Sequence, residues 1–287
     1  MWYALTSSLD TFNTMRIITL TALLLATPAA PGILANAAVP AAAEAVRQPA
    51  TCDPARFKIM VDVGHTSENQ GATSARGIKE YVFNLRLATQ MEKALKEAGF
   101  AQTHLLVMHG ATRAQLFKRA ELANELAVDL FVSIHHNDVQ ERYKSTWEFD
   151  GETRPYSDQF SGHSLFVSRE NPRFSDSLAF GRLLGLELKS RGLVYTRHHT
   201  ENVAGERREL LDAEAGVYRY DGLVVLRYTN VPAVLVEAGI IINRDEELVL
   251  ESPEQQALLT NALVAAVQQY CASKQAKPAG RRAPKKK

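Results

Sequence analysis

The chain has 287 residues, with 33 Lys and Arg, 32 Asp and Glu, and a formal net charge of +1. This length allows one large domain or two small ones with a buried core, and it excludes a miniprotein held together by disulfides. The near-neutral total gives no sign of a nucleic-acid partner. The total hides an uneven distribution, because residues 51–271 carry 24 basic and 30 acidic residues while residues 272–287 carry seven basic residues and no acid.

The N-terminal segment has the features of a secretory signal peptide. Met15 and an arginine precede an apolar run, residues 17–26, which is too short to span a bilayer and is followed by two prolines. A stretch of small residues offers a cleavage site after Ala37. We therefore expect translation to start at Met15, residues 1–37 to be removed, and the mature chain to be exported without a transmembrane segment. A retained membrane anchor is the alternative.

Two cysteines bracket the part of the chain that can form a domain. Residues 38–52 form an Ala/Pro linker with too little apolar bulk for a core. Cys52 ends this linker, and Cys271 follows the last expected helix. In an exported chain this placement favours a disulfide that joins the two ends of the domain. Two buried free thiols are the alternative, because sequence does not show whether the geometry for a bridge is met.

Apolar runs and helical spacings alternate along the rest of the chain. Residues 57–63 predict a strand, and the spacing of apolar residues from about residue 80 to Gly99 predicts a helix. Further strands are expected at residues 104–108, 129–134, 164–168, 223–227 and 233–236, and further helices at residues 113–127, 175–191 and 253–270. The alternation predicts an α/β fold, a three-layer sandwich with a mostly parallel central sheet and helices on both faces, in one domain over residues 53–271.

Polar residues that follow apolar strands are the first candidates for a site, because ligands gather at the carboxyl ends of strands in open α/β sheets. His65 follows the first strand, His135 the third and Glu237 the last. Glu80 opens the first helix, where a short loop could fold it back towards His65. Taken singly, a histidine at a strand end is more often hydrogen-bonded scaffold, and a glutamate at a helix start is favoured by the dipole.

Taken together, these residues suit a zinc hydrolase. Two imidazoles and one carboxylate form a donor set that zinc prefers, and a catalytic zinc site has three protein ligands and one position for water. Glu237 could then accept the proton from that water. The spacing of 15 residues between His65 and Glu80 is no general zinc signature, so these residues by themselves leave zinc hydrolysis as a hypothesis.

Five sequence blocks, which occur in the same order as in a known family, make the functional prediction more specific. They are Val-Asp-Val-Gly-His (61–65), Gly-Ile-Lys-Glu (77–80) with Asn-Leu (84–85), Leu-Phe-Lys-Arg-Ala (116–120) with Ala-Asn (123–124), Val-Ser-Ile-His-His-Asn (132–137), and Val-Leu-Arg (225–227) with Pro-Ala-Val-Leu-Val-Glu-Ala-Gly (232–239). Together they resemble the zinc-dependent N-acetylmuramoyl-L-alanine amidases of the Amidase_3 family, over about residues 58–247.

The resemblance implies that His65, Glu80 and His135 hold one zinc ion and that Glu237 is the catalytic carboxylate. It implies peptidoglycan as the substrate, cleaved at the amide between the lactyl group of N-acetylmuramic acid and the L-alanine of the stem peptide, and a location in the cell envelope, in the periplasm. The sequence departs from the family pattern around the implied ligands without removing any of them. The departures are Val63, Thr66, His136 and Ile-Ile-Ile-Asn at residues 240–243.

Two further residues are candidates for binding the substrate. His199 belongs to a polar cluster with Arg207 and Arg208 that could line the groove, because arginines can clamp stem-peptide carboxylates. Arg227 matches a family position. A surface loop is the alternative for the cluster around His199. A structural ion pair is the alternative for Arg227 and equally for Arg119, which also matches a family position.

The polar residues 138–161 fall where some relatives that act in cell division carry a helix that blocks the active site. One of the five carboxylates between residues 141 and 158 could occupy the open zinc position, and a solvated loop is the alternative. Whether an activator protein is a further partner stays open.

The basic tail, residues 272–287, lacks apolar residues to bury, so we expect it to be disordered. It would hold the enzyme near anionic wall polymer or lipid, or serve solubility alone. Two other functions remain open beside the amidase: a zinc peptidase acting on stem peptides, and a non-catalytic wall-binding module with the same fold.

Overall fold

The structure is a computed structural model that describes residues 53–110, 113–203 and 207–275. The expected signal peptide with its start at Met15, the linker and the tail beyond Gln275 lie outside the described residues. Within the described ranges, no helix has the length and apolar character needed to cross a membrane. The first residues of the expected tail are helical, because the last helix continues to Gln275.

A seven-stranded sheet forms the centre of the fold, as expected. Its strands, in spatial order, are β2 (Thr103–Leu106), β1 (Ile59–Val63), β3 (Leu130–Asn137), β9 (Ala233–Ile240), β6 (Ser164–Val167), β8 (Val217–Arg219) and β7 (Glu209–Asp212). The first four strands pair in parallel, and β6 pairs in parallel with β8. The pairings of β9 with β6 and of β8 with β7 are antiparallel. All five residues of β1 are buried, as is typical of a parallel strand covered on both faces.

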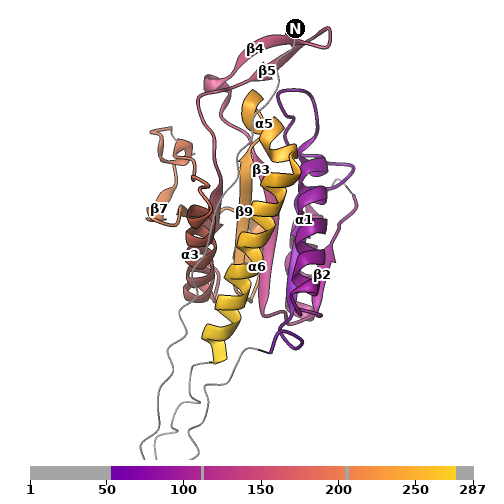
Figure 1. The fold of residues 1–287 in the computed structure, drawn as a ribbon, viewed down its shortest axis with the longest axis vertical. Coiled ribbons are helices and arrows are strands. Elements are labelled where there is room, and N and C mark those ends of the chain that lie inside the picture. Colours follow the sequence, from indigo (N-terminus) through magenta and orange to yellow (C-terminus); the bar gives the residue numbers. More distant parts are fainter. Residues whose placement is uncertain (1–52, 111–112, 204–206, 276–287) are drawn as a thin grey trace, which may run out of the picture. The chain divides into compact units, whose positions relative to one another are not determined.

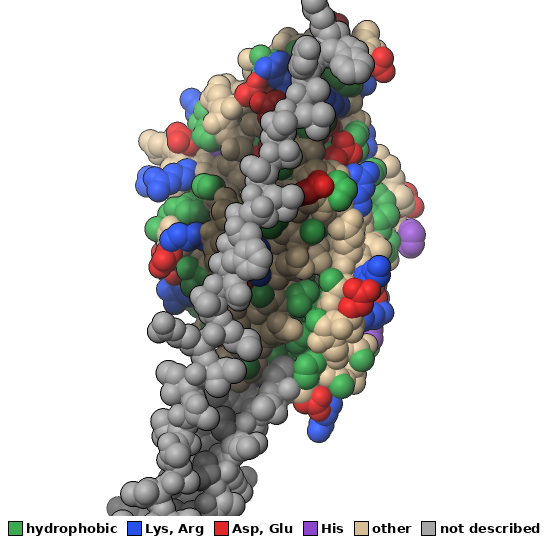
Figure 2. All heavy atoms as spheres, in the orientation of Figure 1, with side chains coloured by type: hydrophobic (Ala, Val, Ile, Leu, Met, Phe, Trp, Pro, Cys, Tyr) green, Lys and Arg blue, Asp and Glu red, His purple; other side chains and the backbone are tan. Residues whose placement is uncertain are grey.

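Helices cover both faces of this sheet. The helices are α1 (Glu80–Glu97), α2 (Ala114–Glu125), α3 (Phe174–Ser190), α4 (Val224–Arg227), α5 (Arg244–Glu251) and α6 (Pro253–Gln275). Figure 1 shows α6 lying in front of the sheet between α1 and α3. These three helices share one apolar cluster with alternate strand residues such as Val61. On the other face, Ala123 of α2 and Leu226 of α4 pack with Met60 and Phe131. Basic and acidic side chains are interspersed along the edges of the face with α6 (Figure 2).

The expected strand at residues 223–227 is wrong, because this segment forms α4. The amide groups of Leu226 and Arg227 donate to the Leu223 carbonyl oxygen, which closes one helical turn. A short apolar run of this kind is ambiguous, since periodicity does not distinguish a buried strand from a buried helical turn. The sequence reading also missed α5, where the Asn243 side chain accepts hydrogen bonds from the first helical amide groups.

The polar residues 138–161, expected as a loop or a blocking helix, form a hairpin outside the central sheet. A 3-10 turn (Glu141–Tyr143) leads into the antiparallel strands β4 (Ser145–Phe149) and β5 (Glu152–Tyr156). Asp150 and Gly151 join these strands with φ angles of 52° and 74°, as an Asp-Gly hairpin turn requires. Residues 196–220 are also polar and show no clear period in the sequence. Their described part contains a 3-10 turn (His198–Thr200) and the β7–β8 hairpin.

Cys271 is buried in α6 and is disulfide-bonded, so a free thiol at this position is excluded. Cys52, the other cysteine of the sequence, lies outside the described residues.

A buried ion pair joins β1 to α2 beneath the carboxyl end of the sheet. Arg119 is 2% exposed and its guanidinium contacts the carboxylate of Asp62, which is fully buried. The same guanidinium donates to the carbonyl oxygens of Val63 and His65. The other carboxylate oxygen of Asp62 accepts from the Ser133 hydroxyl at 2.6 Å. Arg119 therefore has the structural role that the sequence left as one of two alternatives.

We predict that Arg119→Met lowers the free energy of unfolding by about 3–5 kcal/mol, because Asp62 is left as a buried charge without its partner. Burial raises the pKa of Asp62. The charge of Arg119 opposes this rise, so its removal should raise the pKa of Asp62 further. The folded variant then takes up a proton at a higher pH than the parent does, and the loss should shrink as the pH falls below 7. Urea unfolding of the parent and the variant at several pH values measures both effects.

The matched control is Lys118→Met, at an exposed neighbouring position whose surface pair with Glu121 is worth about 0–1 kcal/mol. Equal stability of Arg119→Met and the parent would contradict the role assigned to the buried pair.

Candidate metal centre

His65, Glu80 and His135 come together at the carboxyl end of the sheet. One donor atom from each residue lies within 4.8 Å of the other two. His65 Nε2 is 2.8 Å from Glu80 Oε2, and His135 Nδ1 is 2.9 Å from Glu80 Oε1. The three residues that the sequence proposed as ligands therefore form one cluster, with the carboxylate between the two imidazoles.

Two glycines allow this close approach. A Cβ atom on Gly64 would lie 2.5 Å from the His135 ring, and a Cβ atom on Gly71 would lie 2.4 Å from Glu80 Oε2. His65 itself has a φ angle of 65°, in the left-handed region that residues other than glycine rarely adopt. Such strain is kept only where the surroundings hold it, and here the buried Arg119 binds the His65 carbonyl oxygen.

Glu80 is 4% exposed and is held by several donors besides the two imidazoles. The amide group of Ala72 donates to Oε2 at 3.0 Å, and Oε1 accepts from Asn84 Nδ2 at 3.1 Å and from the His136 amide at 3.3 Å. Burial works against the charged form, but the hydrogen bonds from His135 and His65 outweigh it and hold the pKa of Glu80 well below its usual value. Glu80 is therefore ionised at neutral pH.

Asn84 is a residue whose role sequence reasoning missed. Its amide nitrogen donates to Glu80 and to the Gly64 carbonyl oxygen, and its Oδ1 lies 2.8 Å from His136 Nδ1. Burial lowers the pKa of His136 to about 3, so this ring is neutral. The spacing of four residues between Glu80 and Asn84 on one helix was the available signal, because such residues share a helix face.

Glu237 lies beside the cluster, in an environment that differs from that of Glu80. It is directly opposite His135 in the pairing of β9 with β3. Within the described part of the chain, its buried Oε2 atom has no hydrogen-bond partner. Burial, and then the negative charge of Glu80, raise the pKa of Glu237 well above its usual value. A carboxyl with these properties is suited to taking up and releasing a proton.

A cleft of about 570 Å³ opens at the cluster. His65 and His135 lie at one part of its wall, and apolar side chains of α2 and α4 such as Leu116 and Val225 form another. Arg113 adds a positive charge to the lining. The cleft can therefore take a ligand with both polar and apolar parts and present it to the histidines.

The two candidate substrate-binding residues lie outside the lining of this cleft. His199 Nε2 is 2.9 Å from Asn137 Nδ2, at the end of the strand that carries His135. Burial lowers the pKa of His199 to about 2, with a further contribution from His198 and Arg208, so its ring is neutral. Arg227 lies in α4, not in a strand as expected, and forms an ion pair of 2.5 Å with Glu170.

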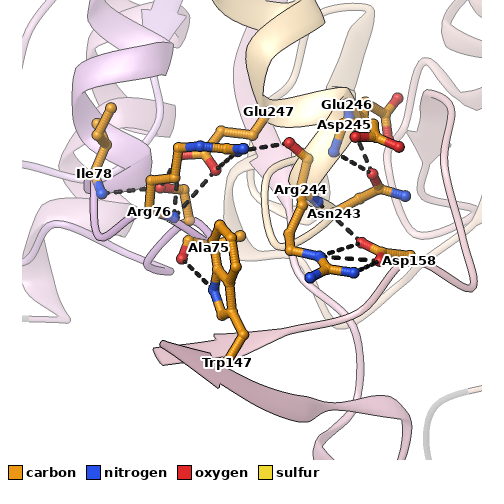
Figure 3. A network of polar contacts seen from close by, with 11 residues as sticks. Ala75, Arg76, Ile78, Trp147, Asp158, Asn243, Arg244, Asp245, Glu246 and Glu247 are labelled. Atoms are coloured by element: carbon orange, nitrogen blue, oxygen red, sulfur yellow. Dashed lines mark hydrogen bonds and ion pairs between the residues drawn. The ribbon is translucent and has the colours of Figure 1, made fainter. Parts of the chain in front are cut away.

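The hairpin of residues 138–161 contributes no carboxylate to the cluster. Of its six acidic residues, five have partners away from the cluster: Asp138 and Glu141 with Lys144, Glu148 with Thr153, Glu152 with Arg154, and Asp158 with Arg244. Figure 3 shows the indole of Trp147 donating to the Ala75 carbonyl oxygen while Arg244 binds Asp158. The hairpin is thus attached to α5 and to the loop that precedes Glu80.

The family model Amidase_3, described as N-acetylmuramoyl-L-alanine amidase, matches residues 59–269. The amidase AmiA of Escherichia coli is 24% identical over 238 residues, which cover 74% of this chain and 75% of AmiA.

Solved structures of amidases share the fold. The amidase Ami1 from Mycobacterium smegmatis matches with a TM-score of 0.58 and 17% identity, over 77% of this chain and 99% of Ami1. The amidase CwlD from Clostridioides difficile, in complex with the GerS lipoprotein, matches with a TM-score of 0.54 and 20% identity, over 75% of this chain and 98% of CwlD. The family match spans most of the chain and includes every residue of the cluster. The chain belongs to the Amidase_3 family and is an enzyme of the N-acetylmuramoyl-L-alanine amidase class, which acts on peptidoglycan.

Proposed function

We propose that His65, Glu80 and His135 hold one zinc ion and that Glu237 is the general base and acid. The reaction is hydrolysis of the amide between the lactyl group of N-acetylmuramic acid and the L-alanine of the stem peptide. One observation carries the proposal: three donor atoms within 4.8 Å of one another stand beside a glutamate whose buried oxygen has no partner in the described chain.

The donor set fits zinc. Two imidazole nitrogens and one carboxylate oxygen are ligands that zinc accepts, and three protein ligands leave a position for water in a catalytic site. Glu80 is ionised and oriented by Asn84 and two backbone amide groups, as a ligating carboxylate usually is. Hard cations such as magnesium prefer an all-oxygen set, so the two histidines favour zinc over them.

Each residue has a separate role in the reaction. Zinc held by His65, Glu80 and His135 would lower the pKa of a bound water from ~16 to ~7 and would polarise the scissile carbonyl group. Glu237 accepts a proton from the attacking water and delivers it to the departing alanine nitrogen when the carbon–nitrogen bond breaks. The raised pKa of Glu237 supports this double role, because the group must hold the proton between the two steps.

The proposal extends to Arg227 and His199 as contacts to the substrate. Arg227 lies in the helix whose Val224 and Val225 line the cleft, and its ion pair with Glu170 is partly exposed and therefore weak. A stem-peptide carboxylate could replace Glu170 in that pair. His199 contacts Asn137, two residues after His135, and could meet the part of the substrate beyond the cluster.

We further propose that the enzyme is exported and acts in the cell envelope, where its substrate lies, and that a partner protein activates it. The relative CwlD, whose structure was solved in complex with the GerS lipoprotein, supports a protein partner.

Incubation with purified peptidoglycan should release intact stem peptides with a free L-alanine amino group and leave the sugar strands uncut. Mass spectrometry of the soluble and insoluble fractions measures this, and a chelator should abolish the release until zinc is restored. Single amino acids or shortened stems would instead show a peptidase. Absence of any release by the zinc-loaded enzyme, with and without envelope extract as a source of partner proteins, would favour a non-catalytic module.

Substitutions should separate metal binding from proton transfer. Glu237→Gln should keep one zinc per chain and lose about 10²–10⁴-fold in kcat, because only the proton acceptor is removed. His65→Ala should lower the zinc content itself, because two ligands bind the ion weakly. Zinc analysis by mass spectrometry together with kcat distinguishes the two. Glu214→Gln, at an exposed glutamate paired with Lys189, is the matched control. Full activity of Glu237→Gln would contradict the proposed role.

A further inference from the structure

Glu237 lies in a row of three polar side chains that crosses three strands. β9 runs between β3 and β6 in the central sheet. Glu237 of β9 is directly opposite His135 of β3 and, on the other side, directly opposite Ser164 of β6. Residues directly opposite in a sheet point to the same face, so Ser164 shares the face that carries Glu237 and His135.

Two buried polar atoms in this row have no partner in the described part of the chain. One is Glu237 Oε2, and the other is the hydroxyl oxygen of Ser164. Ser164 is 0% exposed, so bulk water does not reach its side chain. Unpartnered polar atoms are uncommon in protein interiors and call for a specific explanation. Here the unpartnered hydroxyl is a donor, and the unpartnered carboxylate oxygen opposite to it is an acceptor.

The geometry of the pairing brings the two groups within reach. In antiparallel pairs, the Cβ atoms of directly opposite residues lie about 4.5–5.5 Å apart. A serine hydroxyl has three staggered positions about χ1, and the glutamate side chain has three rotatable bonds, so a change of rotamer in either residue can bring the two groups to hydrogen-bond distance. Among the described residues the Ser164 hydroxyl has no competing partner, whereas the nearby Ser168 hydroxyl contacts Asp221 at 3.1 Å.

We propose that Ser164 is a positioning residue, whose hydroxyl donates a hydrogen bond to Glu237 and turns the other carboxylate oxygen towards the reacting water. This inference rests on the proposed role of Glu237 as general base. A flexible carboxylate with no fixed donor would sample orientations in which proton transfer is impossible, and misplacement by about 1 Å can cost 10²-fold in rate. Ser164 acts through Glu237 and does not touch the substrate or the zinc ligands.

The test compares Ser164→Ala with Ser164→Thr in the zinc-loaded enzyme, using a soluble N-acetylmuramoyl peptide as substrate. Ser164→Ala should lower kcat about 10–100-fold, with KM and zinc content unchanged, because the hydroxyl acts on proton transfer alone. Ser164→Thr keeps the hydroxyl and should retain kcat within about three-fold. Ser168→Ala is the matched control, because it removes a serine hydroxyl that follows the same strand but donates to Asp221. The kcat of this variant should equal that of the parent.

A double-variant cycle separates this inference from the proposed function. If Ser164 acts through Glu237, then Ser164→Ala should have no further effect on the residual rate of Glu237→Gln. A further loss of the same size in that background would overturn the inference and leave the role of Glu237 standing. An active Glu237→Gln variant would instead overturn the proposed function itself.

Two more results would overturn the inference alone. One is a kcat of Ser164→Ala within two-fold of the parent while Glu237→Gln is inactive. The other is a crystal structure of the zinc-loaded enzyme in which Ser164 Oγ is not about 2.5–3.0 Å from a Glu237 carboxylate oxygen. The crystal structure also decides the question if the Ser164 variants do not fold.

Discussion

The candidate metal centre depends on the buried guanidinium of Arg119. This group joins α2 to the end of β1 through Asp62 and also binds the carbonyl oxygens of Val63 and His65. The backbone at His65 has a positive φ angle, which a histidine adopts only when neighbouring groups hold it there. Arg119 of α2 thus helps to hold the backbone conformation that turns the His65 side chain towards Glu80.

Glu80 is held from the opposite side, by the loop that precedes α1. Ser74 and Arg76 of this loop bind Glu247 of α5. The β4–β5 hairpin adds further support, because the Trp147 indole donates to the Ala75 carbonyl oxygen (Figure 3). The Arg154 guanidinium also packs where a Cβ atom on Gly77 would lie. Residues 138–161, for which the sequence allows a solvated loop or a segment that blocks the site, therefore support the loop that precedes Glu80. Substitutions in the hairpin should therefore alter the position of Glu80, and through it the geometry of the cluster.

The sequence predicts the parts of this arrangement that depend on local pattern. Buried parallel strands have continuous apolar sequences, so they are recognisable in the chain. His65 and His135 follow two such strands, and this position predicts that both lie at the carboxyl edge of the sheet. The run at residues 223–227 was misassigned because a four-residue helical turn and a short strand have the same apolar character. The partners of Asp62 and Glu80 could not be predicted, because they come from segments brought together only by the packed fold. The Asp-Gly turn of the hairpin was a local signal that could have been used.

Two glutamates of the site acquire different properties from the number of donors around them. Glu80 receives hydrogen bonds from two imidazoles, two backbone amide groups and Asn84, and its pKa is held low. Glu237 has a buried oxygen with no donor in the described chain and faces the charge of Glu80, so its pKa is raised. A carboxylate that must hold a cation needs the first environment, and one that must carry a proton needs the second. Because the negative charge of the ionised Glu80 contributes to the raised pKa of Glu237, the two carboxyl groups are parts of one electrostatic arrangement.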